Sequence, residues 1–211
     1  MAIALKFRRR CADSRARHVS KKVIRGCCQD LAASPRADLT SPSMVETVIS
    51  IRAARLGDED EIATVHDAAW REAYRGVIPG RELERMIARR GPEWWRLAIA
   101  RRTPLLVLEF GDSVVGYISY GRNRVPALGY GGEIFELYLA PECQGCGFGR
   151  RMFDAARKDL AGHGLSNLVV WALADNDRAV GFYRRLGGRV LRRARETFGG
   201  QQRDRIAFGF G

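Results

Sequence analysis

The sequence lacks long apolar runs. No stretch approaches the roughly 18 consecutive apolar residues that a membrane-spanning helix needs, so we predict no transmembrane segment and no membrane as a partner. Cysteine is also sparse: the 211 residues contain five, an odd number, and three of them (Cys11, Cys27 and Cys28) lie near the N-terminus. Because nothing resembles the paired cysteine framework of a disulfide-stapled secreted domain, we expect a reducing, cytoplasmic compartment.

Metal ligands are few as well. Cys143 and Cys146 form a single C-x-x-C pair, while His66 and His163 stand alone in the sequence. A structural zinc ion normally takes four such ligands, from two such pairs or from one pair and histidines. We therefore expect no metal, and we interpret the two cysteines as small residues tolerated in a crowded loop.

Negative charge is scarce at the N-terminal end. Residues 1–43 contain 10 Lys/Arg and 3 Asp/Glu, whereas the rest of the chain contains 26 and 21, so more than half of the net charge of +12 lies in this segment. A nucleic-acid-binding fold would place clustered basic residues on a recognisable motif, and we find none. Nucleic acid is thus not an expected partner, although a basic tail that binds it remains a rival interpretation.

The N-terminal segment also lacks apolar periodicity. We predict a basic, disordered extension over residues 1–47 and one folded domain over residues 48–211. Two alternatives stay open for the extension: its acid-poor composition imitates an organellar transit peptide, and Met44 could be the true start.

The remaining chain has the content of a globular domain, with 46% hydrophobic and 28% charged residues. Its periodicity predicts a mixed, mostly antiparallel α/β sheet of about seven strands with a central parallel βαβ unit and about four helices. Strands are expected at 47–55, 104–110, 113–121, 133–140, 165–173, 188–198 and 203–210. Helices are expected at about 56–76, at 79–100 with a break near Gly91-Pro92, at about 148–161 and at 177–187.

A glycine-rich loop opens the helix at about 148. The stretch reads "ECQGCGFGRRM", and glycines there let an anion approach the unpaired N–H groups of a helix start. Two phosphate-binding motifs are excluded, because no lysine and hydroxyl follow as in a P-loop, and Arg150 occupies the place of the third glycine of a dinucleotide fingerprint.

Gln144-x-x-Gly147-x-Gly149 does resemble the pyrophosphate-binding motif of the GNAT N-acetyltransferase superfamily. The preceding "EIFELYLAPE", the later "ADNDRAVGFYRRLGG" and the early "AWREAYRGVIP" are similar to segments of the same family. The resemblance covers residues 50 to about 210. It implies the GNAT-like acyl-CoA transferase fold and acetyl-CoA as cosubstrate.

The resemblance also implies how acetyl-CoA would be held between two strands that splay apart. Backbone groups of Leu137, Tyr138 and Leu139 would bind the pantetheine arm, and Asn176 and Tyr183 would approach the thioester. The pyrophosphate would lie on Gln144 and on the amides of the loop, namely those of Gly145, Cys146, Gly147, Phe148, Gly149 and Arg150. Asn176 is also suited to capping the helix that begins at Asp177.

Acetyl transfer needs a neutral amine, so the enzyme must accept a proton from an acceptor whose pKa is near 10. Glu133 stands eleven residues before Gln144, as the base does in several family members. Glu136 is the second candidate and would face the other side of a regular strand. Bound water is the alternative to both.

Three aromatic residues have two interpretations each. Tyr183 is the candidate acid for the leaving thiolate, or else a core residue. Trp70 and Tyr74 share one helix face, where they either bind the substrate or belong to the core.

We therefore predict an acetyl-CoA-dependent N-acetyltransferase. It would move the acetyl group directly, in a ternary complex, to a primary amine of a small molecule or a protein, because no Cys–His–acid set suggests a covalent acetyl-enzyme. A transferase for another acyl-CoA and a CoA-binding regulatory module without turnover remain alternatives. A homodimer is left open.

Overall fold

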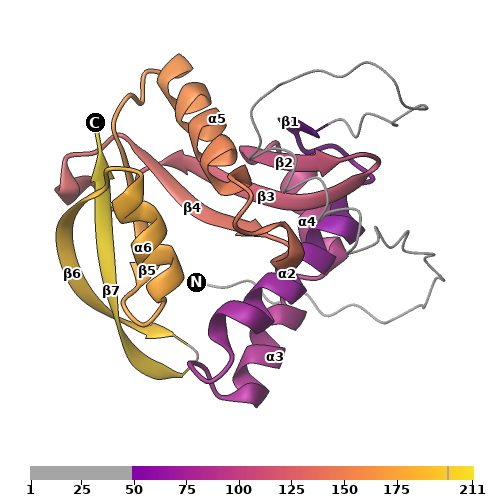
Figure 1. The fold of residues 1–211 in the computed structure, drawn as a ribbon, viewed down its shortest axis with the longest axis horizontal. Coiled ribbons are helices and arrows are strands. Elements are labelled where there is room, and N and C mark those ends of the chain that lie inside the picture. The colour runs from indigo at the N-terminus through magenta and orange to yellow at the C-terminus, as the bar shows by residue number, and fades with distance from the viewer. Residues whose placement is uncertain (1–48, 199) are drawn as a thin grey trace, which may run out of the picture.

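Seven strands form one sheet in the computed structural model of the protein, which describes residues 49–198 and 200–211 (Figure 1). They lie across the sheet in the order β1-β2-β3-β4-β5-β7-β6. Their bounds are Ile49–Ala53 (β1), Leu105–Phe110 (β2), Ser113–Arg122 (β3), Gly132–Leu139 (β4), Leu168–Leu173 (β5), Arg189–Phe198 (β6) and Gln201–Phe210 (β7). The extension predicted for residues 1–47 lies outside the described residues and stays a prediction.

Five α-helices accompany the sheet in the described part of the chain, close to the four expected. They are Glu59–Tyr74 (α2), Gly80–Ala88 (α3), Pro92–Ala100 (α4), Phe148–Gly162 (α5) and Asp177–Arg185 (α6). The break predicted near Gly91-Pro92 separates α3 from α4, and Pro92 takes the first position of α4, where its fixed φ suits a helix start. None of the helices in the described ranges has the length and apolarity needed to cross a lipid bilayer.

The strand pairing confirms the predicted mixed α/β fold. β4 and β5 are parallel and are connected through α5, as a parallel pair requires. All the other neighbouring strands are antiparallel, including the β2–β3 and β6–β7 hairpins. The parallel unit therefore joins two antiparallel halves of the sheet.

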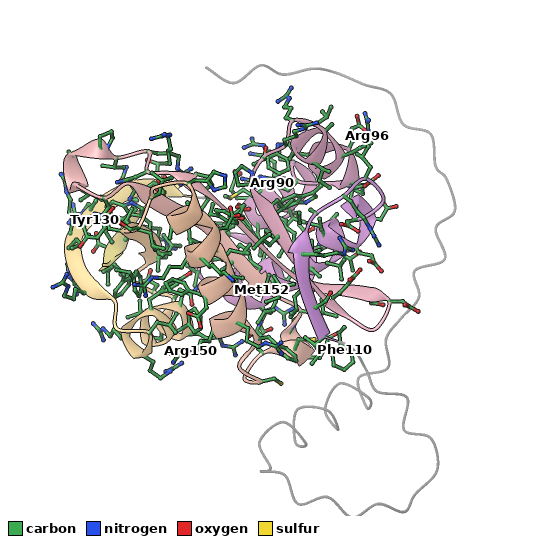
Figure 2. All side chains as sticks on the ribbon, turned by 90° about the horizontal axis from the view of Figure 1, so that it is seen from above. Arg90, Arg96, Phe110, Tyr130, Arg150 and Met152 are labelled. Atoms are coloured by element: carbon green, nitrogen blue, oxygen red, sulfur yellow. The ribbon has the colours of Figure 1, made fainter. Side chains whose placement is uncertain are left out.

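Helices cover both faces of the sheet. Neighbouring strand residues point to opposite faces: Ile118 of β3 packs with Met152 of α5, while Tyr117 packs with Ile62 of α2. We call these the α5 face, which α6 also covers, and the α2 face, which α3 and α4 complete. Figure 2 labels Met152 in the middle of the molecule and Arg150, at the start of α5, near its edge.

β4 is irregular at Phe135. Ile134 pairs with Tyr120 and Glu136 pairs with Ser119, so Phe135 has no counterpart on β3. An extra residue of this kind is a β-bulge, which interrupts the strict alternation of side chains along a strand. The bulge lies at the point where β4 also leaves β5.

Candidate functional site

The site begins with a gap in the sheet. The parallel ladder of β4 and β5 contains three residue pairs, from Gly132↔Leu168 to Ile134↔Val170, although both strands continue beyond it. β4 is buried along the ladder and only half-buried from Phe135 to Leu139. The predicted separation of two strands is therefore present, and Leu137, Tyr138 and Leu139 border it.

The glycine loop lies beside this gap, at the start of α5. Gly145 and Gly147 have φ values of 85° and 79°, in the left-handed region that favours glycine. A Cβ at either position would meet no atom of the described chain within 4 Å. Gly149 differs, because a Cβ there would lie 3.3 Å from the ring of Phe182. The first two glycines are thus required by conformation and the third by packing.

The charges at this helix start suit an anion. Gly147 is the N-cap residue and has no side chain to bond the first amides of α5. The first turn of α5 contains no acid, whereas Arg150 and Arg151 occupy it despite the positive end of the helix dipole. Arg150 is largely exposed and has Asp154 at 3.7 Å. Open amides and two arginines fit the pyrophosphate of a CoA ester.

Gln144 is bound by an arginine that the sequence pattern did not predict. Arg178 of α6 donates hydrogen bonds to the Gln144 side-chain oxygen and, at 2.8 Å, to Glu72 of α2. Asn176 accepts a hydrogen bond from the amide of Ala179 at 3.0 Å, which confirms the predicted cap. The position of Arg178, two residues after Asn176, was the one signal in the sequence that could have indicated a role for it. Its partners Glu72 and Gln144 belong to distant segments, so the contacts themselves could not be predicted.

Tyr183 is buried in the core on the α5 face. Its ring lies 5.9 Å from that of Phe208, and its side chain belongs to the cluster that includes Phe210. Burial, and secondarily the nearby Tyr74 hydroxyl, raise the pKa of Tyr183, so the hydroxyl keeps its proton at neutral pH. The position is compatible with an acid for the thiolate and with a core residue.

The two candidate bases lie on the same face of the sheet. Ile134 belongs to the core on the α5 face, so its neighbour Glu133 points to the α2 face. Glu136 contacts Tyr117, which is also on the α2 face. The expectation that Glu133 and Glu136 face opposite sides is wrong, because the bulge at Phe135 shifts the alternation by one residue.

Glu133 has both carboxylate oxygens engaged. The guanidinium of Arg124 lies 2.6 Å from one oxygen, and the Arg124 backbone N–H donates to the other at 2.8 Å. The side chain of Glu133 is 2% exposed. This pair fixes the connection between β3 and β4.

Glu136 has a different environment. Arg90 donates a hydrogen bond to Oε2 at 3.1 Å and lies 3.0 Å from Oε1 as an ion pair, and the Tyr117 hydroxyl lies 3.5 Å from Oε2. Burial raises the pKa of Glu136, while Arg90 and Tyr117 act in the opposite direction. A carboxylate with a raised pKa is a stronger base than an exposed one.

Trp70 and Tyr74 lie in the buried aromatic cluster next to Glu136. Their ring centroids are 5.1 Å apart, and the Tyr74 hydroxyl bonds that of Tyr138 at 2.8 Å. Burial raises the pKa of Tyr74 to about 12. Both residues are at most 8% exposed, which fits the core interpretation, while Tyr74 and Tyr138 together reach the gap.

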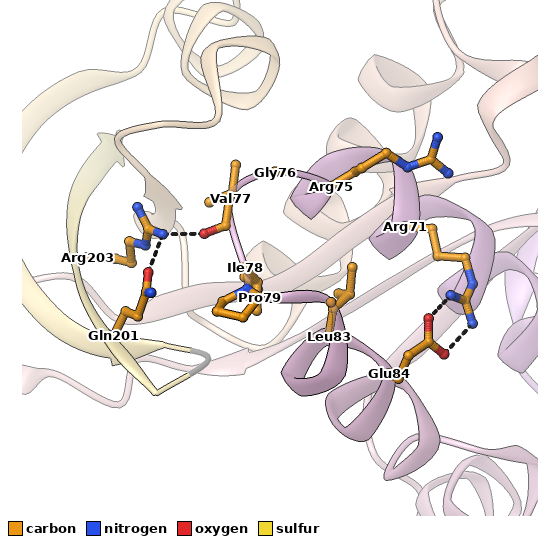
Figure 3. A pocket seen from close by; sticks show the side chains of 11 residues that line it. Arg71, Arg75, Gly76, Val77, Ile78, Pro79, Leu83, Glu84, Gln201 and Arg203 are labelled. Carbon is orange, nitrogen blue, oxygen red and sulfur yellow. Dashed lines mark hydrogen bonds and ion pairs between the residues drawn. The ribbon is translucent and has the colours of Figure 1, made fainter.

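A cavity of about 500 Å³ opens between the α2–α3 connection and the β6–β7 hairpin (Figure 3). Its middle is apolar and includes Ile78 and Leu83, which pack in one cluster with Tyr74 and Leu173. Arg203 stands at one end, where it donates a hydrogen bond to the Val77 carbonyl. The cavity therefore borders the same aromatic cluster as Glu136.

No metal site accompanies this arrangement in the described ranges, since no group of three or more His, Cys, Asp or Glu side chains there could hold an ion. Burial raises the pKa of the Cys143 thiol to about 12. That thiol is consequently a poor nucleophile at neutral pH.

Residues 62–188 match the model of the acetyltransferase (GNAT) family. Among curated relatives, the uncharacterized N-acetyltransferase YuaI of Bacillus subtilis is 32% identical over 136 residues, 64% of this chain and 78% of YuaI. A mycothiol acetyltransferase of Pseudarthrobacter chlorophenolicus is 32% identical over 72% of this chain, and one of Streptomyces bingchenggensis is 29% identical over 82%. The chain spans about half of these two relatives, 45% and 56% of their lengths.

Solved structures share the fold. The PaiA N-acetyltransferase of Thermoplasma acidophilum, in complex with coenzyme A, aligns with a TM-score of 0.63 at 20% identity and covers 77% of this chain and 98% of its own. The acetyltransferase YncA of Salmonella typhimurium, with its cofactor acetyl-CoA, aligns with a TM-score of 0.54 at 19% identity, covering 78% and 94%.

Proposed function

The chain belongs to the acetyltransferase (GNAT) family, and from this premise we propose that it transfers the acetyl group of acetyl-CoA directly to a primary amine of a small molecule or a protein. The observation that carries the proposal is the gap that opens after Ile134 and Val170, with the glycine loop at its side and the largely buried carboxylate of Glu136 on β4.

The chain offers two sets of backbone groups to acetyl-CoA. The amides from Gly145 to Arg150 would bind the pyrophosphate, and Gln144 and Arg178 border the same loop. Backbone groups of Leu137, Tyr138 and Leu139 would hold the pantetheine arm along the part of β4 that does not pair with β5. When bound, acetyl-CoA supplies the activated acetyl thioester.

Glu136 is the base that we propose, in preference to Glu133. It would take the proton that the amine nitrogen loses on attack, and its raised pKa suits that task. Glu133 is engaged by Arg124 through both oxygens, so we assign to it the fixing of the β3–β4 connection. Tyr183, which stays protonated at neutral pH, would give its hydroxyl proton to the departing sulfur.

The acceptor would approach from the α2 face, where Glu136 and the cavity lie. The apolar middle of the cavity suits an apolar part of the acceptor, held between Ile78 and Leu83. The names of the mycothiol acetyltransferases suggest small thiol-containing amines as one group to test, but the chain spans only about half of those proteins. Small molecules and protein N-termini both remain in the proposal.

A panel of primary amines, with acetyl-CoA and with propionyl- and succinyl-CoA, tests the activity through the release of free thiol. Initial-velocity lines that intersect when both substrates are varied support direct transfer, whereas parallel lines would indicate an acetyl-enzyme and refute it. Tight binding of acetyl-CoA without thiol release by any amine would favour the CoA-binding module without turnover.

A further inference from the structure

A continuous contact leads from the interior of α2 to the proposed base. His66 Nδ1 lies 2.7 Å from the Tyr117 hydroxyl, and that hydroxyl lies 3.5 Å from Oε2 of Glu136. His66 and Tyr117 are both 0% exposed. Their rings pack among other aromatic rings, with Trp70 4.6 Å from His66 and Trp95 4.7 Å from Tyr117.

The direction of these hydrogen bonds follows from counting protons. The Tyr117 hydroxyl has one proton and two neighbouring acceptors, the imidazole of His66 and the carboxylate of Glu136. If His66 carries its proton on Nδ1, it donates to Tyr117, and Tyr117 is free to donate to Glu136. If the proton is on Nε2, Tyr117 must donate to Nδ1 and leaves the carboxylate without that bond. Only the Nδ1-protonated tautomer satisfies both contacts.

A proton on Nδ1 of His66 also agrees with the surroundings of the other ring nitrogen, Nε2. Nε2 of His66 is buried and has no hydrogen-bond partner among the residues that the structure describes. Burial, with a smaller effect of Arg90, lowers the pKa of His66 to about 3, so the ring stays neutral over the pH range of enzyme assays. His66 therefore acts as a constant donor and does not change charge with pH.

We infer that His66 and Tyr117 are positioning residues for the acetyl transfer, which orient the carboxylate of Glu136 and favour its ionised form; the inference rests on the proposed role of Glu136 as the base. Arg90 holds the carboxylate from the α3–α4 turn, and Tyr117 holds Oε2 from β3. Two fixed donors leave a defined direction for the lone pair that takes the proton of the amine. The hydroxyl contact is long for an O–H···O bond, and such contacts commonly shorten when substrate binds.

The sign of the effect on pH dependence is determined by the groups around the carboxylate. Those that face Glu136 or lie in its electrostatic surroundings are Arg90 from the α3–α4 turn, Tyr117 from β3, Tyr138 from β4, His66 and Tyr74 from α2, and Arg124 from the β3–β4 connection. A donor to the ionised form lowers the pKa of a carboxyl group. Removing the Tyr117 hydroxyl should thus raise the pKa of Glu136 and shift the ascending limb of the kcat/KM profile to higher pH.

The first experiment compares the pH profiles of wild type, Glu136→Gln and Tyr117→Phe. We expect Glu136→Gln to abolish the ascending limb or to move it up to the acceptor's own pKa, and Tyr117→Phe to retain it but move it upward by about one pH unit, about tenfold in rate at a fixed pH on the limb. Affinity for acetyl-CoA should be unchanged in both. A limb that stays at its wild-type position in Glu136→Gln would refute the proposed base. If Glu136→Gln loses the limb or moves it to the acceptor's pKa, but Tyr117→Phe leaves it at its wild-type position, Glu136 remains the base and the positioning role of His66 and Tyr117 is overturned.

The second experiment tests His66 with two amides. By chain length the amide nitrogen of Asn corresponds to Nδ1 of histidine and that of Gln to Nε2, so His66→Asn should keep the limb closer to the wild-type position than His66→Gln. ¹⁵N NMR of the wild-type imidazole, in a chain with three histidines, needs no variant to fold. A proton on Nδ1 of His66 supports the inference, and a proton on Nε2 overturns it.

Discussion

Replacing Gly147 by glutamate should separate the binding of acetyl-CoA from the stability of the fold. Gly147 has a φ of 79°, so any side chain there adopts the left-handed conformation, at about 1–2 kcal/mol. A Cβ at this position meets no neighbour within 4 Å, so the new side chain extends into the open space in front of α5. A suitable control is Gly164→Glu, because Gly164 has a φ of 76° and equally open surroundings at the other end of the same helix.

The two variants should differ in opposite ways in affinity and in stability: Gly147→Glu should lose more affinity for acetyl-CoA, and Gly164→Glu should lose more stability. A carboxylate about 4 Å from a phosphate oxygen opposes it by about 4 kcal/mol at an effective dielectric constant of 20, about a thousandfold in affinity. Gly164 lies beyond the far end of the 15-residue helix, which is itself about 22 Å long, and at that separation the repulsion vanishes. For stability the order reverses, because a negative charge is favourable at the start of a helix and unfavourable at its end, by roughly 0.3–1 kcal/mol each.

Calorimetric titration with acetyl-CoA and thermal unfolding of both variants provide the measurements. We expect a large loss of affinity only in Gly147→Glu, and a larger decrease of the melting temperature in Gly164→Glu, each lost kcal/mol corresponding to about 2–4 °C. Unchanged affinity in Gly147→Glu, or equal losses in the two variants, would show that the loop does not bind the pyrophosphate.

Four further substitutions have distinct expected outcomes. Glu136→Gln should lower kcat by roughly 10²–10⁴ with little change in acetyl-CoA affinity, whereas Glu133→Gln should mainly lower the melting temperature because it disrupts the bonds to Arg124; the reverse result in steady-state kinetics would restore Glu133 as the base. Tyr183→Phe should lower kcat at every pH of the assay, because the raised pKa keeps the wild-type hydroxyl protonated throughout and the variant has no proton to give to the leaving thiolate; an unchanged kcat would leave Tyr183 a core residue. Asn176→Ala should destabilise the protein by about 1 kcal/mol through the lost cap of α6, and an unchanged melting temperature would contradict that contribution.

Local patterns were sufficient for much of the site. The strand before the loop, the glycines at a helix start and the cap at Asn176 depend on residues close together in sequence, so the location of each could be predicted. The sequence also offered two glutamates as candidates for the base, with bound water as the alternative. Gly149 was predicted for its place in the motif, but the ring of Phe182 that crowds a side chain at this position belongs to α6 and could not be inferred.

What could not be predicted depends on pairing between distant segments. The bulge at Phe135 is defined by the pairing with β3. Consecutive residues Ser119 and Tyr120 pair with Glu136 and Ile134, and Phe135 is the extra residue between those two. A reading of β4 alone assumes regular alternation and therefore puts Glu133 and Glu136 on opposite faces. The contact of His66 with Tyr117 joins residues 51 positions apart, so it could not be predicted from the residues around either of them.

The ladder between β4 and β5 is short, so over the rest of their length these two neighbouring strands are not hydrogen-bonded to each other. In the proposed complex the pantetheine arm would lie along β4 where β5 has moved away, so the ligand would act as a surrogate strand and tie the two halves of the sheet together. Global stability then depends on occupancy: free ligand at a hundred times its Kd adds about 2.7 kcal/mol to the free energy of unfolding. The cell's supply of acetyl-CoA would thereby determine how long the enzyme survives as well as how fast it works.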